Sequence, residues 1–172
     1  MGVFHRYKSE IHGNYRRAYL RCGGIAALLL GAYILVRLLI GNPVPTPTSL
    51  PLDGILIVLV FLFMAYYRNS LPDKKITLKE ALLFGIGTAA VAALLFALIL
   101  WVVGLSSAEQ TVLFTNNMTS QDITPQDPQL HYWAAWWAIV AGVELLLLGS
   151  FAAFIAAIFF RNEKSEIKQH KQ

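Results

Sequence analysis

Residues 132–161 read YWAAWWAIVAGVELLLLGSFAAFIAAIFFR, and this stretch decides the fold. Between Trp137 and Phe160 every residue except Glu144 and Ser150 is apolar, alanine or glycine. A helix rises about 1.5 Å per residue, so this run is long enough to cross the ~30 Å hydrocarbon core of a bilayer. The tryptophans just before the run are typical of a membrane interface. The stretch therefore predicts a transmembrane helix that carries one acid.

The rest of the chain has the same apolar character. Of its 172 residues 56% are hydrophobic and 14% are charged, which is too apolar for an ordinary soluble domain. We expect an all-α, polytopic membrane protein made of a single four-helix domain over residues 1–172, with an outer loop at 106–132. Its four transmembrane helices are predicted at about residues 22–40, 52–67, 81–105 and 134–160.

The basic residues predict how the chain is oriented. Thirteen of the 14 lysines and arginines lie before the first span, between the second and third, or after the fourth. The loops at 41–51 and 106–132 contain none. Because basic residues concentrate in cytoplasmic loops, we predict that both termini are cytoplasmic. The net charge of +4 therefore indicates contact with anionic headgroups of the lipid bilayer, and not with nucleic acid.

Local signals predict the parts between the spans. The basic and aromatic residues 1–21 favour a short helix lying on the inner leaflet. The loop at 41–51 has four prolines and is predicted to be extended. Thr77, with a glutamate three residues on, predicts a capping box at the start of the third span. Ser107 heads a similar motif, which predicts a short interfacial helix that ends at Asn116.

Small residues recur every four positions in the spans, a pattern that lets two helices approach closely. The predicted packing positions are Gly23, Ala27, Gly31, Gly85, Ala89, Ala93, Gly142, Gly149 and Ala153. In the last span the small side lies roughly opposite Glu144. We predict that this helix is sandwiched: its acidic side meets the first and third spans, and its small side meets a partner chain or a second copy. The alternative is a protonated Glu144 hydrogen-bonded inside the bundle, with the small side against lipid.

Three charged residues belong to the spans or their ends: Arg37, Asp53 and Glu144. Ionisable groups inside a membrane are expensive to bury and are functional candidates for that reason. The helical projection places Arg37 on the packed side of its helix, near Gly23. We predict that Arg37 forms an ion pair with Glu144 or Asp53, or that these groups contact a partner. The alternative is that Arg37 extends to the nearby interface.

Several short motifs accompany the four spans. The second span ends in Tyr67-Arg68, the third begins Ile76-Thr-Leu-Lys-Glu-Ala…Gly85, and Ser-Gln-Asp-Ile at 120–123 precedes the fourth. In these features the chain resembles the domain-of-unknown-function 4199 membrane proteins, found chiefly in Bacteroidota. The resemblance implies a multi-pass protein of the bacterial inner membrane, and it transfers no functional residue because that family has no established activity. Its members are often found near membrane glycosyltransferases, which suggests such a protein as a partner.

Enzyme signatures are absent from the sequence. It has no glycine-rich phosphate loop, no GxSxG, no HExxH and no CxxC. We therefore expect no catalytic residue, no cofactor, no metal and no enzyme activity. The preferred function is an accessory or scaffolding subunit that packs against a larger membrane protein through the small-residue positions. The alternative is a small oligomeric proton-linked transporter or channel that uses Glu144, although neither internal repeats nor broken helices are evident.

Overall fold

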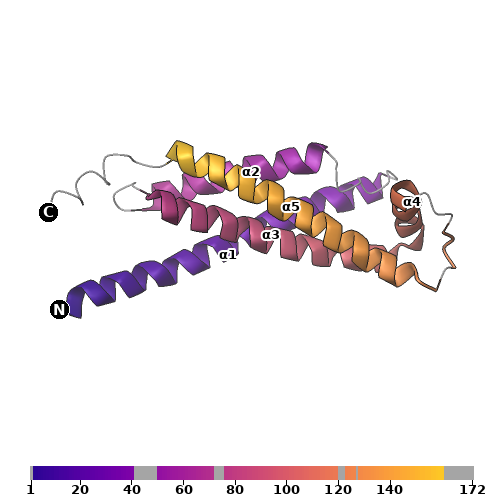
Figure 1. Cartoon of the computed structure of the whole chain (residues 1–172), viewed down its shortest axis with the longest axis horizontal. Helices are drawn as coiled ribbons and strands as arrows, with labels where there is room; N and C mark the ends of the chain where they lie inside the picture. The colour runs from indigo at the N-terminus through magenta and orange to yellow at the C-terminus, as the bar shows by residue number, and fades with distance from the viewer. Residues whose placement is uncertain (1, 41–49, 72–75, 120–122, 127, 161–172) are drawn as a thin grey trace.

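A computed structural model describes residues 2–40, 50–71, 76–119, 123–126 and 128–160 (Figure 1). In this part of the chain the regular secondary structure is all helix, without strands. Its helices are α1 (Gly2–Leu39), α2 (Leu50–Ser70), α3 (Leu78–Ser106), α4 (Ala108–Thr119) and α5 (Leu130–Phe160). Four helices are long and apolar enough to cross a membrane, namely α2, α3, α5 and the Tyr15–Leu39 part of α1. The predicted all-α class with four membrane-length helices is confirmed.

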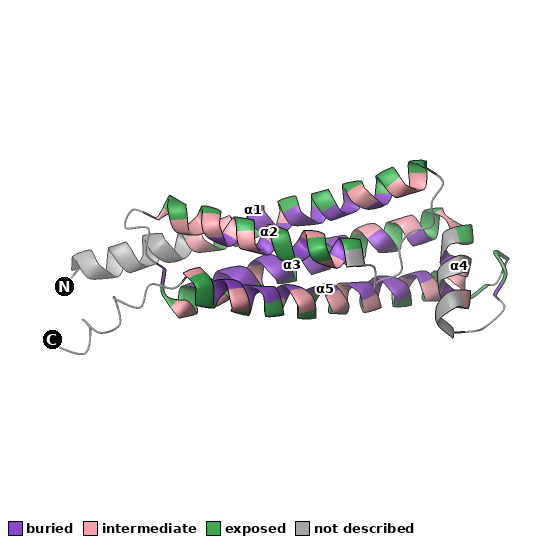
Figure 2. Cartoon of the chain, turned by 90° about the horizontal axis from the view of Figure 1, so that it is seen from above, coloured by how far each residue is buried: buried purple, intermediate pink, exposed green. Residues whose placement is uncertain are grey.

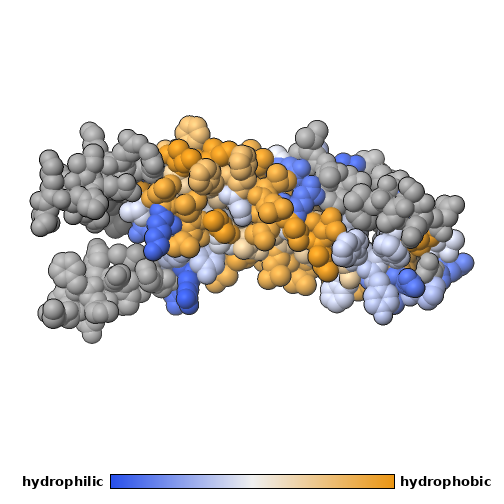
Figure 3. Space-filling view, in the orientation of Figure 1, coloured by the Kyte–Doolittle hydropathy of each residue, from blue (hydrophilic) through white to orange (hydrophobic). Residues whose placement is uncertain are grey.

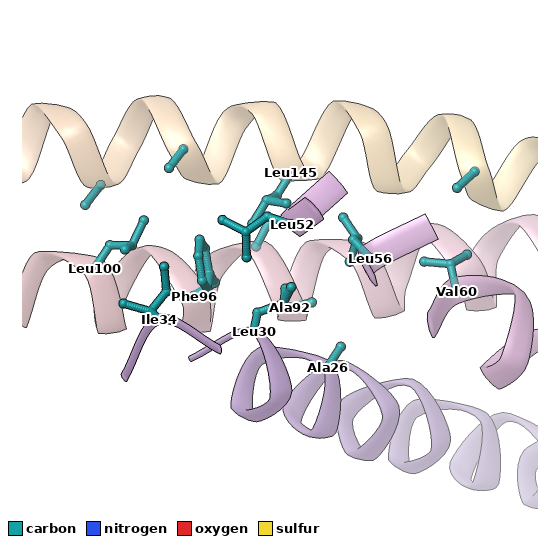
Figure 4. Close-up of a cluster of buried hydrophobic side chains, with 14 of the residues drawn as sticks. Ala26, Leu30, Ile34, Leu52, Leu56, Val60, Ala92, Phe96, Leu100 and Leu145 are labelled. Carbon is teal, nitrogen blue, oxygen red and sulfur yellow. The ribbon is translucent and has the colours of Figure 1, made fainter. Parts of the chain in front are cut away.

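The bundle is built around α3. Helices α1 and α5 pack on opposite sides of α3, and α2 lies mainly along α5 (Figures 1 and 4). Buried side chains face inward on every long helix, and exposed ones face outward (Figure 2). The outer surface is hydrophobic across the middle of the molecule (Figure 3), as expected of helices that face lipid.

Small residues hold α3 against α5 along their whole length. A Cβ atom built on Gly85 would lie 2.5 Å from Ala153 Cβ, and one built on Gly149 would lie 2.6 Å from Ala89 Cβ. Further along, a Cβ on Gly104 would lie 2.9 Å from Ala134 Cβ. The two helices are antiparallel, because the residue numbers in each of these pairs add up to 238. Their backbones come this close because neither helix has a large side chain at the contact.

The close approach predicted from the small residues is confirmed, but the predicted neighbour of the last span is wrong. The small side of α5 does not face outward toward a partner, since Gly142 and Gly149 lie against alanines of α3. The acidic side does not meet the first span either, since α1 and α5 make no close backbone approach in the described residues. The reason is that α3 offers a matching small-residue surface within the same chain, so the closest packing is internal.

The other small residues join α1 to α3. A Cβ atom on Gly23 would lie 2.6 Å from Val91 Cβ, and one on Gly31 would lie 2.9 Å from Ile99 Cδ1. These pairs increase together in residue number, so α1 and α3 run parallel. Large side chains fill the space between the four helices, as Figure 4 shows for one cluster. Its labelled members are Ala26, Leu30, Ile34, Leu52, Leu56, Val60, Ala92, Phe96, Leu100 and Leu145.

Local predictions at the helix ends had mixed outcomes. The capping box at α3 is confirmed: Glu80 N donates to Thr77 Oγ1 at 3.3 Å, and Thr77 N donates to Glu80 Oε2 at 3.1 Å. The separate inner-leaflet helix is wrong, because α1 runs unbroken from Gly2, with no proline before the first span to interrupt it. Helix α2 already includes Pro51, which a first helical turn accommodates. The prolines at 41–49 lie outside the described residues.

Helix α4 covers one end of the bundle (Figure 1). The predicted short helix is confirmed, but it continues past Asn116 to Thr119. The Asn116 side chain instead pairs with the backbone of the following segment. Its Oδ1 accepts from Ile123 N at 2.9 Å, and its Nδ2 donates to Ile123 O at 3.3 Å. Thr111 Oγ1 donates to Gly104 O at 3.0 Å, which fixes α4 to the end of α3.

Candidate functional site

The described residues offer few groups that could carry chemistry. They contain no group of three or more histidine, cysteine, aspartate or glutamate side chains placed to hold a metal ion. Away from the basic end, the charged residues within the four long helices are Arg37, Asp53 and Glu144, and His131 lies in the first turn of α5. Because such groups are costly inside a membrane, they are the candidate site.

Glu144 lies next to the midpoint of α5, which runs from Leu130 to Phe160. Its side chain is half-buried. By the antiparallel register of α3 and α5, Glu144 is level with residue 94 of α3, in the middle of the apolar helix. The acid therefore sits near half depth in the apolar part of the bundle.

Asp53 reaches the same depth although it belongs to the first turn of α2. The side chain of Leu56 lies 3.3 Å from a Cβ built on Gly149, and α2 runs in the same direction as α5. Three residues earlier on α2, Asp53 is therefore level with about residue 146 of α5. The cause is the position of α2, which begins part-way along α5 (Figures 1 and 2).

Asp53 and Glu144 lie at nearly the same level on α2 and α5, which pack against each other. Their chain neighbours Leu52 and Leu145 belong to one buried cluster (Figure 4). Asp53 Oδ1 is buried and accepts no hydrogen bond in the part of the chain that is described. Two neighbouring carboxylates repel each other strongly where water is scarce, so such a pair favours sharing a proton or binding a cation.

Arg37 does not form the predicted ion pair with Glu144 or Asp53 in the described residues. Its Nη1 donates to Tyr33 Oη at 3.3 Å, and no described carboxylate lies within ion-pair distance of it. Continuing the α1–α3 register six residues past Gly31 places Arg37 level with residue 105, roughly 16 Å along the axis from the level of Glu144. The sequence projection gave the right side of the helix, but it could not give this difference in depth.

A cluster of aromatic side chains lies at the opposite end of the bundle. The rings of Tyr67 and Phe84 stack with centroids 4.3 Å apart, and Tyr15 packs edge-on against both. Tyr15 Oη also donates to Glu80 O at 3.2 Å. Sequence reasoning did not identify this cluster, because its rings come from three helices. Its position at a helix end is typical of an interfacial aromatic belt.

Comparison of the chain with protein-family models, with curated proteins and with solved structures finds no match. The resemblance drawn from the short motifs therefore stays a prediction, as does the compartment it implies.

Proposed function

We propose that this chain is a small proton-linked membrane protein, a transporter or channel, in which the Asp53–Glu144 pair takes up and releases a proton. The observation that supports this proposal is that two acids, Asp53 and Glu144, lie at nearly the same level, near half depth, on the packed helices α2 and α5. Intramembrane acids of this kind mark proton relays in pumps and transporters.

The internal packing of the small residues weakens the case for an accessory subunit relative to a proton-linked transporter or channel. The accessory-subunit function requires small-residue surfaces that are open to a partner. Those surfaces are used inside the bundle, where Gly23 and Gly31 meet α3 and Gly149 meets Ala89. What remains for a partner on α5 is a surface of large apolar side chains, which suits lipid equally well.

The test is proton binding and proton flux in reconstituted protein. Infrared difference spectra recorded across a pH titration should show a protonated carboxyl that loses its proton in the wild type. Asp53→Asn and Glu144→Gln should each remove that signal. In liposomes with an internal pH-sensitive dye, the wild type should dissipate a pH gradient faster than either variant. The matched control is Glu109→Gln, which removes an exposed acid on α4 and should behave as wild type.

Two results would count against the proposal. One is an infrared titration in which the carboxyl signal survives both substitutions. The other is wild-type flux that equals the flux of empty liposomes under every pH gradient applied. In either case the pair would be a structural contact between α2 and α5, and not a proton site.

A second candidate function is the accessory subunit, favoured by one exposed stripe on α5. Its members recur at intervals of four, three and four residues, as in a helix–helix seam: Leu147, Phe151, Phe154 and Ile158. A photo-crosslinking residue at Phe154 should capture a membrane protein in native membranes if this function is correct. The same probe at Val102, an exposed position on α3, is the control.

A further inference from the structure

Arg37 is isolated from the other basic residues of the chain. The sequence has no lysine or arginine between residues 38 and 67 or between 80 and 160. At the end of the bundle covered by α4, Arg37 is therefore the single lysine or arginine of the described residues, and the histidine at that end is His131 in α5. A guanidinium group stays charged at any physiological pH, so this charge needs an anion or water.

Exposed aromatic side chains at the same level as Arg37 indicate its depth in the membrane. Its level on α3 is about residue 105. By the α3–α5 register, Trp136 lies opposite residue 102 and Tyr132 opposite residue 106, and these side chains are 58% and 68% exposed. Exposed tryptophan and tyrosine collect at the level of lipid headgroups. The guanidinium is thus placed at headgroup depth, where phosphate is the abundant anion.

The donors around Arg37 are only partly used. Of the five N–H groups of a guanidinium, one on Nη1 is directed to Tyr33 Oη, and Nε is buried without a hydrogen-bond partner in the described chain. The other Nη hydrogens remain available. Because Tyr33 Oη accepts the bond from Arg37, its own hydrogen can donate to an acceptor that lies beside the guanidinium. A guanidinium fork beside a hydroxyl donor matches the oxygens of a phosphate group.

We propose that Arg37 and Tyr33 form a binding site for a phosphate group at the α4 end of the bundle, with the headgroup of a phospholipid as its ligand. This site is separate from the carboxyl pair and does not depend on the proposed proton function.

The test is native mass spectrometry of delipidated protein in mild detergent, titrated with phosphatidylglycerol. Arg37→Gln should weaken binding of one lipid by about ten-fold or more, the range expected for hydrogen bonds to a charged group. Tyr33→Phe should weaken it by about three-fold to ten-fold. Leu39→Gln is the matched control, since Leu39 is 87% exposed and two residues away, and it should bind as wild type. Basic residues at the other end bind lipid equally in all variants, so the differences report on this site.

Further titrations identify the source of the phosphate. A glycosyl diacylglycerol, which has no phosphate, should show no difference between wild type and Arg37→Gln. Competition by millimolar inorganic phosphate would support the phosphate site with a soluble ligand, and lack of competition would support the lipid headgroup. Phosphatidylglycerol binding that is unchanged in both Arg37→Gln and Tyr33→Phe would overturn the proposal. If Arg37→Gln fails to fold, Tyr33→Phe, which keeps the ring, decides the question.

Discussion

Gly85 is the position where one added methyl group should disturb the bundle most clearly. In Gly85→Ala the new Cβ would lie 2.5 Å from Ala153 Cβ, against the 3.4 Å at which ordinary contact begins. Helices α3 and α5 would have to separate by roughly 0.9 Å, which would loosen the contacts of the whole seam. Overpacking of this kind costs about 1–3 kcal/mol, and we expect Gly85→Ala to lower the free energy of unfolding by that amount.

A second substitution at the Gly85–Ala153 contact should restore part of the lost stability. Ala153→Gly removes the methyl group that the new side chain meets, so the double variant Gly85→Ala/Ala153→Gly should lose less stability than the two single variants together. We expect a coupling of about 1 kcal/mol or more, because the two side chains touch. Two neighbours of the new Cβ remain: Met64 Cε at 2.9 Å, the end of a flexible side chain that can move, and the Cα of residue 153 at 3.2 Å, which is backbone, so the rescue should be partial.

The assay is equilibrium unfolding in mixed micelles, followed by tryptophan fluorescence. Gly24→Ala is the control, because a Cβ there has no neighbour within 4 Å. It should be neutral or slightly stabilising, since alanine favours a helix over glycine. If Gly85→Ala unfolds no more easily than Gly24→Ala, or if the double variant shows simple additivity, the close seam between α3 and α5 is not the one described here.

Three further predictions follow from the fold. In intact cells, and with Cys22 replaced by alanine, a membrane-impermeant thiol reagent should label Gln126→Cys and miss Asn69→Cys; labelling of the second position would invert the predicted topology. Thr77→Ala should lower stability by about 1 kcal/mol through loss of the capping box, and Thr77→Ser, which retains the hydroxyl, should restore it. Asn116→Ala should speed hydrogen exchange of the amide that its side chain binds, with little change in α3; unchanged exchange would mean that another group holds this segment.

The features that could be predicted from the sequence are those set by residues close together in the chain. The four spans follow from long apolar runs, and the Thr77 capping box follows from two residues three positions apart. Both features are local, so no knowledge of the other helices is needed.

Two errors are local: α1 runs unbroken from Gly2, and α4 continues past Asn116. The other errors concern relations between helices. The sequence does not state that α3 lies beside the small side of α5 in antiparallel register, so a partner was predicted there. The predicted ion pair of Arg37 with Glu144 or Asp53 does not form in the described residues, because the register of the helices separates them in depth. The meeting of Asp53 with Glu144 depends on α2 beginning part-way along α5, and that position is set by long-range packing.

The seam between α3 and α5 also constrains the order in which the protein is made. Helix α3 leaves the ribosome well before α5, which follows it in the chain after α4. Until α5 arrives, the row of small residues on α3 offers a shallow groove to whatever helix is near, either in the insertion machinery or in another nascent chain. A chain that stops before residue 130 would keep that groove open permanently. Quality control of this protein in the membrane is therefore expected to depend on the synthesis of α5, since α5 covers the small residues of α3.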